Sequence, residues 1–224
     1  MIKPRRFGTA LVLVAVLTCA LAGAQDNAQG VDLLTAARTG DLTRVEALLH
    51  AKVDANTMDD TGKTALMMAS EAGHLEVVKV LLNANAYVNV SWDSGNSTTA
   101  LMMAAKNGHL EVVKMLLNAK AEVNTKAHKL HMETALMMAS ENGHAGVVQA
   151  LIAAKADVNA IDYPHASNAL MRASGNGHVE VVRALIAAGA DVNSSNVNDE
   201  SPLSLATKAG HQDVVQLLKN AGAL

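Results

Sequence analysis

Aromatic residues and cysteine are scarce in this chain of 224 residues, which has one Trp, two Tyr, one Phe and one Cys. Half of the residues are nevertheless hydrophobic, so a core without Phe must be filled by Ala, Leu, Val, Ile and Met. Such side chains suit closely packed helices better than a β-sandwich or an α/β sheet. We therefore expect an all-α fold.

The first 24 residues differ in character from the rest. A basic region, a short apolar run and a small-x-small cleavage signal follow one another: Lys3, Arg5 and Arg6, then Ala10–Leu17, then Ala22–Ala24. This order predicts a secretory signal peptide over residues 1–24, with the mature chain beginning at Gln25. An uncleaved membrane anchor is the alternative, but it would need about 20 apolar residues. Lipidation of Cys19 is a second alternative, for which Thr18 is a poor preceding residue.

Cleavage would remove the lone cysteine, so the mature chain would have no disulfide, thiol nucleophile or cysteine metal site. It would also leave 15 Lys+Arg against 21 Asp+Glu, a balance that argues against nucleic acid as a partner. No transmembrane run follows Leu21, so we expect no stable membrane insertion after cleavage. A compact signal and a cysteine-free chain favour the bacterial periplasm, with extracellular release as the alternative.

A single motif recurs through the rest of the chain. The stretch Thr64–His74 returns as Thr99–His109, Thr134–His144, Asn168–His178 and Ser201–His211. The glycines of the Gly-His or Gly-Asp doublets are spaced by 33, 35, 35, 34 and 33 residues. A fixed period of this length predicts a stack of one repeated unit. After a polar linker over 25–30, we assign a repeat domain over 31–224, with repeats at about 31–62, 63–97, 98–132, 133–166, 167–199 and 200–224.

Each unit is predicted to contain two helices and a projecting loop. Thr64 can cap a first helix with its hydroxyl, and Gly73 stands where that helix stops. Leu75–Leu82 has apolar residues at helical spacing and forms the second helix. The chain then leaves through Ala86–Asn89 into an extended finger. Because one such unit cannot bury its apolar side alone, the units must stack.

These motifs resemble those of the ankyrin repeat family. Thr-Ala-Leu-Met-Met-Ala stands where the family usually has Thr-Pro-Leu-His-x-Ala, Gly-His-x-Glu-Val-Val recurs from Gly73, Gly108 and Gly177, and Gly189–Asn193 matches the family's unit ending. The resemblance covers Val31–Leu224. It implies a solenoid of six stacked helix-turn-helix units with extended finger loops, acting as a non-catalytic protein–protein interaction scaffold.

The methionines and histidines of the motif are best explained by structure. Met67, Met102, Met137 and Met171 stand where the family often has a histidine, and we expect them to fill the core. The recurring histidines lie at successive helix–helix turns, about 10 Å apart, which is too far for shared metal ligation. We expect them to bond to turn carbonyls: His74, His109, His144, His178 and His211.

The fingers carry the strongest functional signal because the period stretches there. The intervals from the unit-closing Asn to the next capping residue are 8, 10, 10, 9 and 8 residues. Loop insertions in such folds alter binding more than stability. The candidate binding residues of the fingers are Trp92, Asp93, His128, His131, Tyr163 and His165. Exposed aromatic residues are preferred interface anchors, although Trp92 and Tyr163 could instead fold back over neighbouring repeats. Tyr87, near the end of a second helix, is expected to be structural.

The stack of repeats is expected to have a concave side, along which the fingers line up. Residues just before the helix-ending glycines should face this concave side too. The candidates among them are Glu71, Lys106, Asn107, Glu141, Asn142 and Asn176. Their mixed charge predicts polar recognition, and an ordinary solvated helix face is the alternative.

No hydrolase, phosphate-loop or zinc-helix motif occurs, so we expect no enzyme activity, no catalytic residue and no cofactor. We predict a monomeric scaffold that binds a protein outside the cytoplasm. One alternative is a secreted effector that acts on a foreign or host protein. Another is a metal or small-ligand binder that uses His128 and His131, although no carboxylate stands at ligand spacing beside them.

Overall fold

The computed structural model describes residues 28–91, 98–127 and 131–224, and within them it shows six helix pairs. The first pair is a helix over 28–39 and α2 (Leu42–His50). The others are α3 (Ala65–Ala72) with α4 (Leu75–Asn83), α5 (Ala100–Lys106) with α6 (Leu110–Asn118), α7 (Ala135–Glu141) with α8 (Ala145–Ala153), α9 (Ala169–Gly175) with α10 (Val179–Ala187), and α11 (Pro202–Ala209) with α12 (Gln212–Asn220). This is the all-α solenoid of stacked helix-turn-helix units that the sequence predicts.

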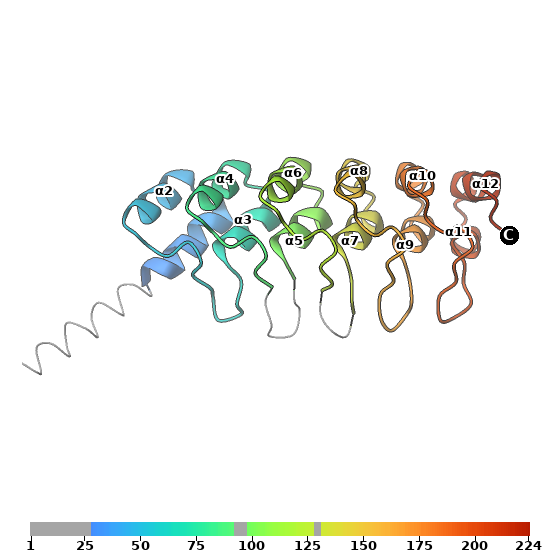
Figure 1. Cartoon of the computed structure of the whole chain (residues 1–224), viewed down its shortest axis with the longest axis horizontal. Coiled ribbons are helices and arrows are strands. Elements are labelled where there is room, and N and C mark those ends of the chain that lie inside the picture. Colours follow the sequence, from blue (N-terminus) through green and yellow to red (C-terminus); the bar gives the residue numbers. More distant parts are fainter. Residues whose placement is uncertain (1–27, 92–97, 128–130) are drawn as a thin grey trace, which may run out of the picture.

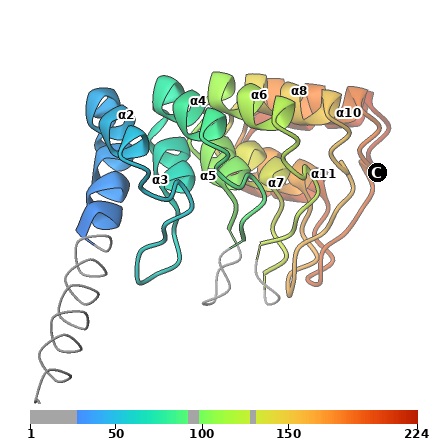
Figure 2. The same ribbon diagram turned by 60° about the vertical axis from the view of Figure 1, so that its left-hand side comes forward.

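The helices form two parallel rows (Figure 1). The even-numbered helices α2 to α12 make an outer row, and the helix over 28–39 with α3, α5, α7, α9 and α11 makes an inner row. The described parts of the fingers project from the same side, below the inner row (Figures 1 and 2). Each inner helix from α3 to α11 contacts the next one, so the fingers stand in register beside one another.

The predicted caps hold the inner helices in place. The side chains of Thr64, Thr99, Thr134, Asn168 and Ser201 each accept a hydrogen bond from the backbone N–H three residues later. At the other end, Gly73 has φ of 79° and Gly108 has φ of 77°, a left-handed conformation that glycine adopts without strain. The start and the end of each inner helix are therefore set by residues of the same unit that flank it.

The first methionine of each Met-Met pair fills the core, as predicted. Met67, Met102, Met137 and Met171 are each 1% exposed. They lie among the leucines and alanines of the inner row, while the outer row contributes valines such as Val78 and Val113. Unbranched thioethers can fill irregular space between helices. The core can therefore be filled although aromatic residues are scarce.

The recurrent histidines tie neighbouring units together. Nε2 of His74, His109, His144, His178 and His211 lies 2.9–3.1 Å from a backbone carbonyl oxygen in the preceding unit. Because a carbonyl only accepts, Nε2 must carry the proton. The prediction that these histidines bond to turn carbonyls is confirmed.

A second tie between units, made by the unit-closing asparagines, was not predicted. Oδ1 of Asn89 accepts from the N–H of Glu122 at 2.9 Å, while its Nδ2 donates to the carbonyl of Lys120 at 3.2 Å. Asn124, Asn159 and Asn193 make the same pair of bonds to the following unit. In each of these units, one asparagine amide thus bonds to two backbone groups of the following unit. Without it, these groups would have to bond to water.

Two expectations need correction. Residues 28–30, assigned to a linker, already belong to the first described helix. Tyr87 lies in the loop after α4 with its side chain exposed, and its backbone N–H donates a 2.7 Å hydrogen bond to Asn56 Oδ1. The predicted signal peptide lies outside the described residues. Within the described ranges, no helix is both long and apolar enough to cross a bilayer.

Replacing Ser140 by alanine is expected to raise the free energy of unfolding by about 1 kcal/mol. The Oγ atoms of Ser70, Ser140 and Ser174 are buried and, among the described residues, have no hydrogen-bond partner. The equivalent Ala105 shows that a methyl group fits this position. Urea unfolding would measure the gain. Ser204→Ala is the control, since Ser204 shares a reciprocal capping box with Ser201, and its loss should destabilise. Destabilisation by Ser140→Ala would contradict the prediction.

Candidate functional site

The fingers are tied to one another by backbone hydrogen bonds. The N–H of Tyr163 donates to the carbonyl of His131 at 2.8 Å, and the N–H of Val197 donates to the carbonyl of His165 at 3.0 Å. Within a finger, Asp162 Oδ1 accepts from the N–H of Ser167 at 2.8 Å. These bonds place predicted binding residues from consecutive fingers side by side.

Three adjoining hollows lie between these fingers and the inner helices, and we call them together the finger groove. The first, of about 180 Å³, includes Glu71, Met103, Lys106, Asn107, His131, Glu133 and Met138 in its lining. The second, of about 330 Å³, is lined by His131, Glu133, Glu141, Asp162, Tyr163, His165, Ser167 and Arg172. The third, of about 470 Å³, includes His165, Ser167, Arg172, Asn176, Asn196 and Glu200. Each hollow shares lining residues with the next, so the three adjoin one another over repeats two to six.

The finger groove brings together most of the described candidate residues. His131, Glu141, Tyr163 and His165 line its central hollow. The first hollow is lined in part by Glu71, Lys106 and Asn107, and the third in part by Asn176. Asn142 lines none of the three. Trp92, Asp93 and His128 lie outside the described residues.

Tyr163 does not fold back over its neighbours. The residue is 55% exposed and lines the central hollow. The candidate asparagines behave differently, because their amides cap their own helices. Nδ2 of Asn107, Asn142 and Asn176 donates to the carbonyl four residues earlier at 2.8–3.0 Å. These asparagines therefore have a structural role in the unit.

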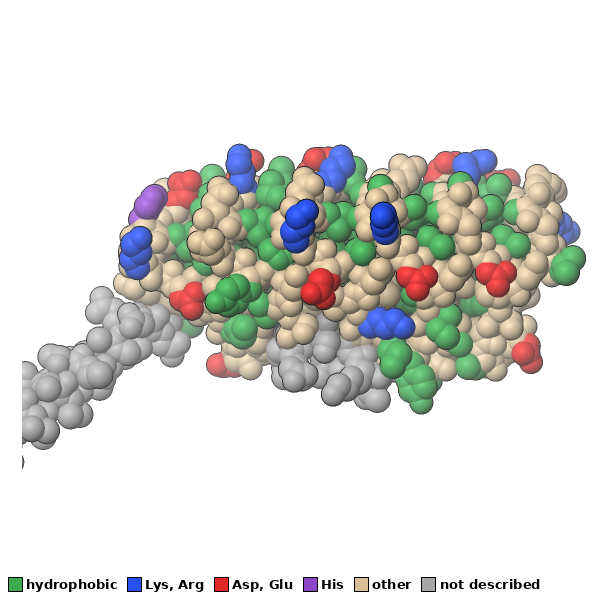
Figure 3. Space-filling view, in the orientation of Figure 1, with side chains coloured by type: hydrophobic (Ala, Val, Ile, Leu, Met, Phe, Trp, Pro, Cys, Tyr) green, Lys and Arg blue, Asp and Glu red, His purple; other side chains and the backbone are tan. Residues whose placement is uncertain are grey.

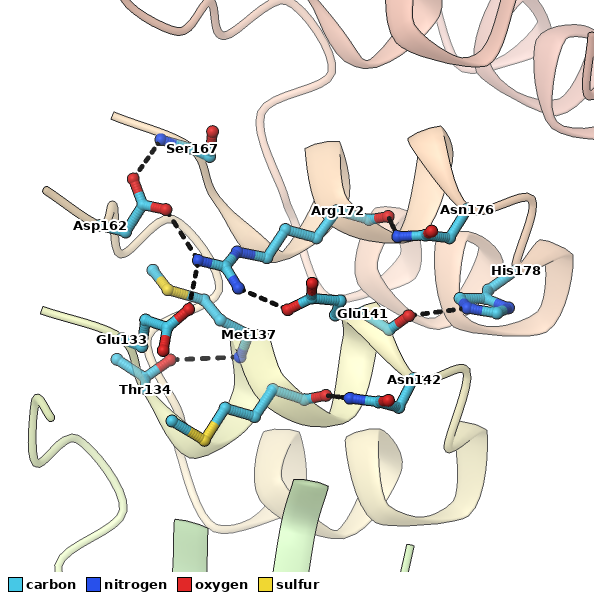
Figure 4. A network of polar contacts seen from close by, with 11 residues as sticks. Glu133, Thr134, Met137, Glu141, Asn142, Asp162, Ser167, Arg172, Asn176 and His178 are labelled. Atoms are coloured by element: carbon cyan, nitrogen blue, oxygen red, sulfur yellow. Dashed lines mark hydrogen bonds and ion pairs between the residues drawn. The ribbon is translucent and has the colours of Figure 1, made fainter. Parts of the chain in front are cut away.

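The floor of the central hollow is an ionic network that the sequence analysis missed (Figure 4). Arg172 of α9 places one terminal nitrogen 2.6 Å from Glu141. Its other terminal nitrogen lies 2.7 Å from Glu133 and 2.8 Å from Asp162. The Arg172 side chain is 15% exposed and that of Asp162 only 4%. One guanidinium thus joins three carboxylates that come from α7, the finger before α7 and the finger before α9.

The pattern of charges in the other repeats explains why Arg172 is needed. The residue before the helix cap and the residue near the helix end carry opposite charges in two repeats, where they pair directly. Lys63 bonds to Glu71 at 3.0 Å, and Lys208 bonds to Glu200 at 3.1 Å. In the fourth repeat both positions are acidic, Glu133 and Glu141. The two carboxylates repel each other. Arg172 reaches them from the next repeat, and its positive charge offsets part of this repulsion.

The pKa of the Arg172 guanidinium lies above its ordinary value. Burial acts to lower this pKa, but the hydrogen bonds that Arg172 donates to Asp162 and Glu133, with the nearby charges of Glu133 and Glu141, raise it by more. The pKa of Glu200, at the far end of the groove, is lowered by hydrogen bonding from Asn196 and by its pairing with Lys208. Both pKa shifts favour the charged forms of Arg172 and Glu200.

A signal for Arg172 was present in the repeats. The motif has a second methionine after the buried one, at Met68, Met103 and Met138, and Arg172 replaces it in the fifth repeat. Met103 and Met138 line the first hollow of the finger groove, so this position faces the groove floor. Comparing the repeats position by position would have identified Arg172.

The outer row of helices differs from the groove. Opposite charges lie side by side along the upper edge of the molecule, over α4, α6 and α10 (Figure 3). These are local pairs three residues apart on one helix and contribute little to stability. Among the described residues, no three His, Cys, Asp or Glu side chains are placed to hold a metal ion.

Comparison with known proteins agrees with this architecture. The family model described as ankyrin repeats (3 copies) matches residues 33–127 and 136–223. The chain is also similar to the "Putative ankyrin repeat protein YahD" of Escherichia coli (strain K12), with 41% identity over 58 residues. That alignment covers 26% of this chain and 29% of the relative, so the similarity concerns a short run of repeats.

Proposed function

The chain belongs to the ankyrin repeat family, and on that premise we propose that it is a non-catalytic scaffold that binds a partner protein through the finger groove, outside the cytoplasm. Ankyrin repeats are generally protein–protein interaction scaffolds, and the family is typically non-enzymatic. Export is proposed from the signal-peptide pattern over residues 1–24.

The observation that carries the binding proposal is the exposed Tyr163 in a groove of adjoining hollows lined by charged and polar side chains. Tyrosine is enriched among the residues that dominate interface energies, because it buries a large apolar ring and keeps a hydrogen-bonding hydroxyl. The backbone bonds between fingers hold this residue in place before binding. Little conformational entropy is then lost when a partner docks.

Tyr163→Ala is expected to weaken partner binding about tenfold or more and to leave the melting temperature unchanged, because the ring is largely exposed. The experiment uses residues 25–224 as bait against a periplasmic extract and against culture medium of the producing cell. Recovered proteins are identified and their affinities measured by calorimetry. Tyr87→Ala is the matched control, because Tyr87 is 66% exposed but does not line the groove.

Equal capture by the Tyr163→Ala variant would overturn the proposed role of the groove. A partner found only in the medium would favour the alternative of a secreted effector that acts on a foreign protein. A partner found in the periplasmic extract favours a resident scaffold.

A further inference from the structure

The finger groove changes character along its length, and this change indicates what it binds. Met103 and Met138 line the first hollow. The adjoining central hollow holds the Glu133, Glu141 and Asp162 carboxylates around Arg172. His131 and Glu133 line both hollows, so a single bound segment can contact the thioethers and the carboxylates together.

The electrostatic balance of the central hollow favours a cation. Three carboxylates surround one guanidinium, and both terminal nitrogens of Arg172 already bond to them. Asp162 is buried, whereas the side chains of Glu133 and Glu141 are 31% and 49% exposed. The excess negative charge therefore lies on the two carboxylates that a ligand can reach. An anionic ligand would meet these carboxylates before the enclosed guanidinium.

The groove also offers apolar and aromatic contact next to that charge. Thioethers are flexible and polarisable, and they are used where a surface must adapt to a partner's apolar side chain. Tyr163 is exposed and lines the central hollow. An aromatic face near a Lys or Arg side chain adds a cation–π attraction.

We propose that the finger groove binds an extended segment of a partner protein that places an apolar side chain over Met103 and Met138 and a Lys or Arg side chain beside Glu133 and Glu141. This rests on the proposed scaffold function and adds the chemistry of the partner. The apolar contact supplies affinity, and the carboxylates select the basic residue and fix the register of the segment.

The test is selection of a phage-displayed library of random twelve-residue peptides on immobilised residues 25–224. We expect the enriched peptides to carry Lys or Arg next to an apolar residue. Their affinity should fall about fivefold for Glu141→Gln and further for Glu133→Gln/Glu141→Gln. It should also fall with added salt, because exposed charges are screened. Asp162 still pairs with Arg172 in these variants, so the fold should persist, which the melting temperature would check.

Glu180→Gln is the matched control, since Glu180 lies on α10 of the outer row and, among the described residues, forms its ion pair with Arg183. Enriched peptides that are acidic, or that bind the double variant as well as the unchanged chain, would overturn the proposal. So would a library that yields no binder while the Tyr163-dependent capture of a partner succeeds, and in that case the scaffold function stands. If that capture also fails, both proposals fall.

Discussion

Arg172→Met is expected to lower the free energy of unfolding by about 3 kcal/mol, measured by equilibrium unfolding in urea. The shape of the new side chain is not the reason, because Met68, Met103 and Met138 occupy the same position in other repeats. The loss comes from the carboxylates that remain. Removing one partner of a buried ionic network leaves uncompensated charge, which costs about 3–5 kcal/mol when burial is complete. Glu133 and Glu141 keep some contact with water, so we expect the lower end of that range.

Two further variants separate charge from packing in this prediction. Arg183→Met removes an exposed arginine whose partner Glu180 lies 3.7 Å away on the same helix, and it should change stability by less than about 0.5 kcal/mol. Arg172→Lys keeps the charge but cannot present a planar fork to three carboxylates, so its loss should be intermediate. If Arg172→Met is as stable as the unchanged chain, the network does not hold the fourth and fifth repeats together.

Gly108→Ala is expected to destabilise the protein by about 3 kcal/mol or more. Gly108 has φ of 77°, where an alanine is strained. A Cβ there would also lie 2.6 Å from Nδ1 of His144, well inside contact distance. The imidazole cannot move aside freely, because its Nε2 bonds to the carbonyl of Lys106 at 3.0 Å. The substitution should therefore break a tie between the third and fourth repeats.

Gly210→Ala is the matched control for that prediction. Gly210 has φ of 81°, but a Cβ there would have no atom within 4 Å, since no histidine of a following unit packs on it. It should cost only the backbone strain, about 1 kcal/mol. The difference between the two variants, measured by urea unfolding, gives the steric part. Equal losses would mean that the contact between glycine and histidine has no energetic weight.

The architecture could be predicted from the sequence because its causes are local and repeat. A capping Thr, a helix-ending Gly and apolar residues at helical spacing act within a few residues of one another, and their recurrence fixes the stacking of the units. The structural role of His74 and its equivalents followed from the same register. The roles of Asn89 and its equivalents did not, because their partners lie more than thirty residues away in the following unit.

The candidate site could be predicted only in part. The fingers were identified because their lengths vary, and Tyr163, His131 and His165 do line one hollow. Arg172 was missed because it stands within a motif that otherwise reads as core filling. Its chemistry depends on acidic residues 10, 31 and 39 positions away in the sequence.

The sequence by itself determined the unit, its helices and the order of the repeats, because each of these depends on short-range capping and periodicity. Only the tertiary structure decided which side chains meet. Stacking places Met103 and Met138 on the groove floor and sets Arg172 of the fifth repeat among three carboxylates of the fourth repeat. Charge pairing between units depends on distances across the stack, and a pattern read along one chain does not contain them.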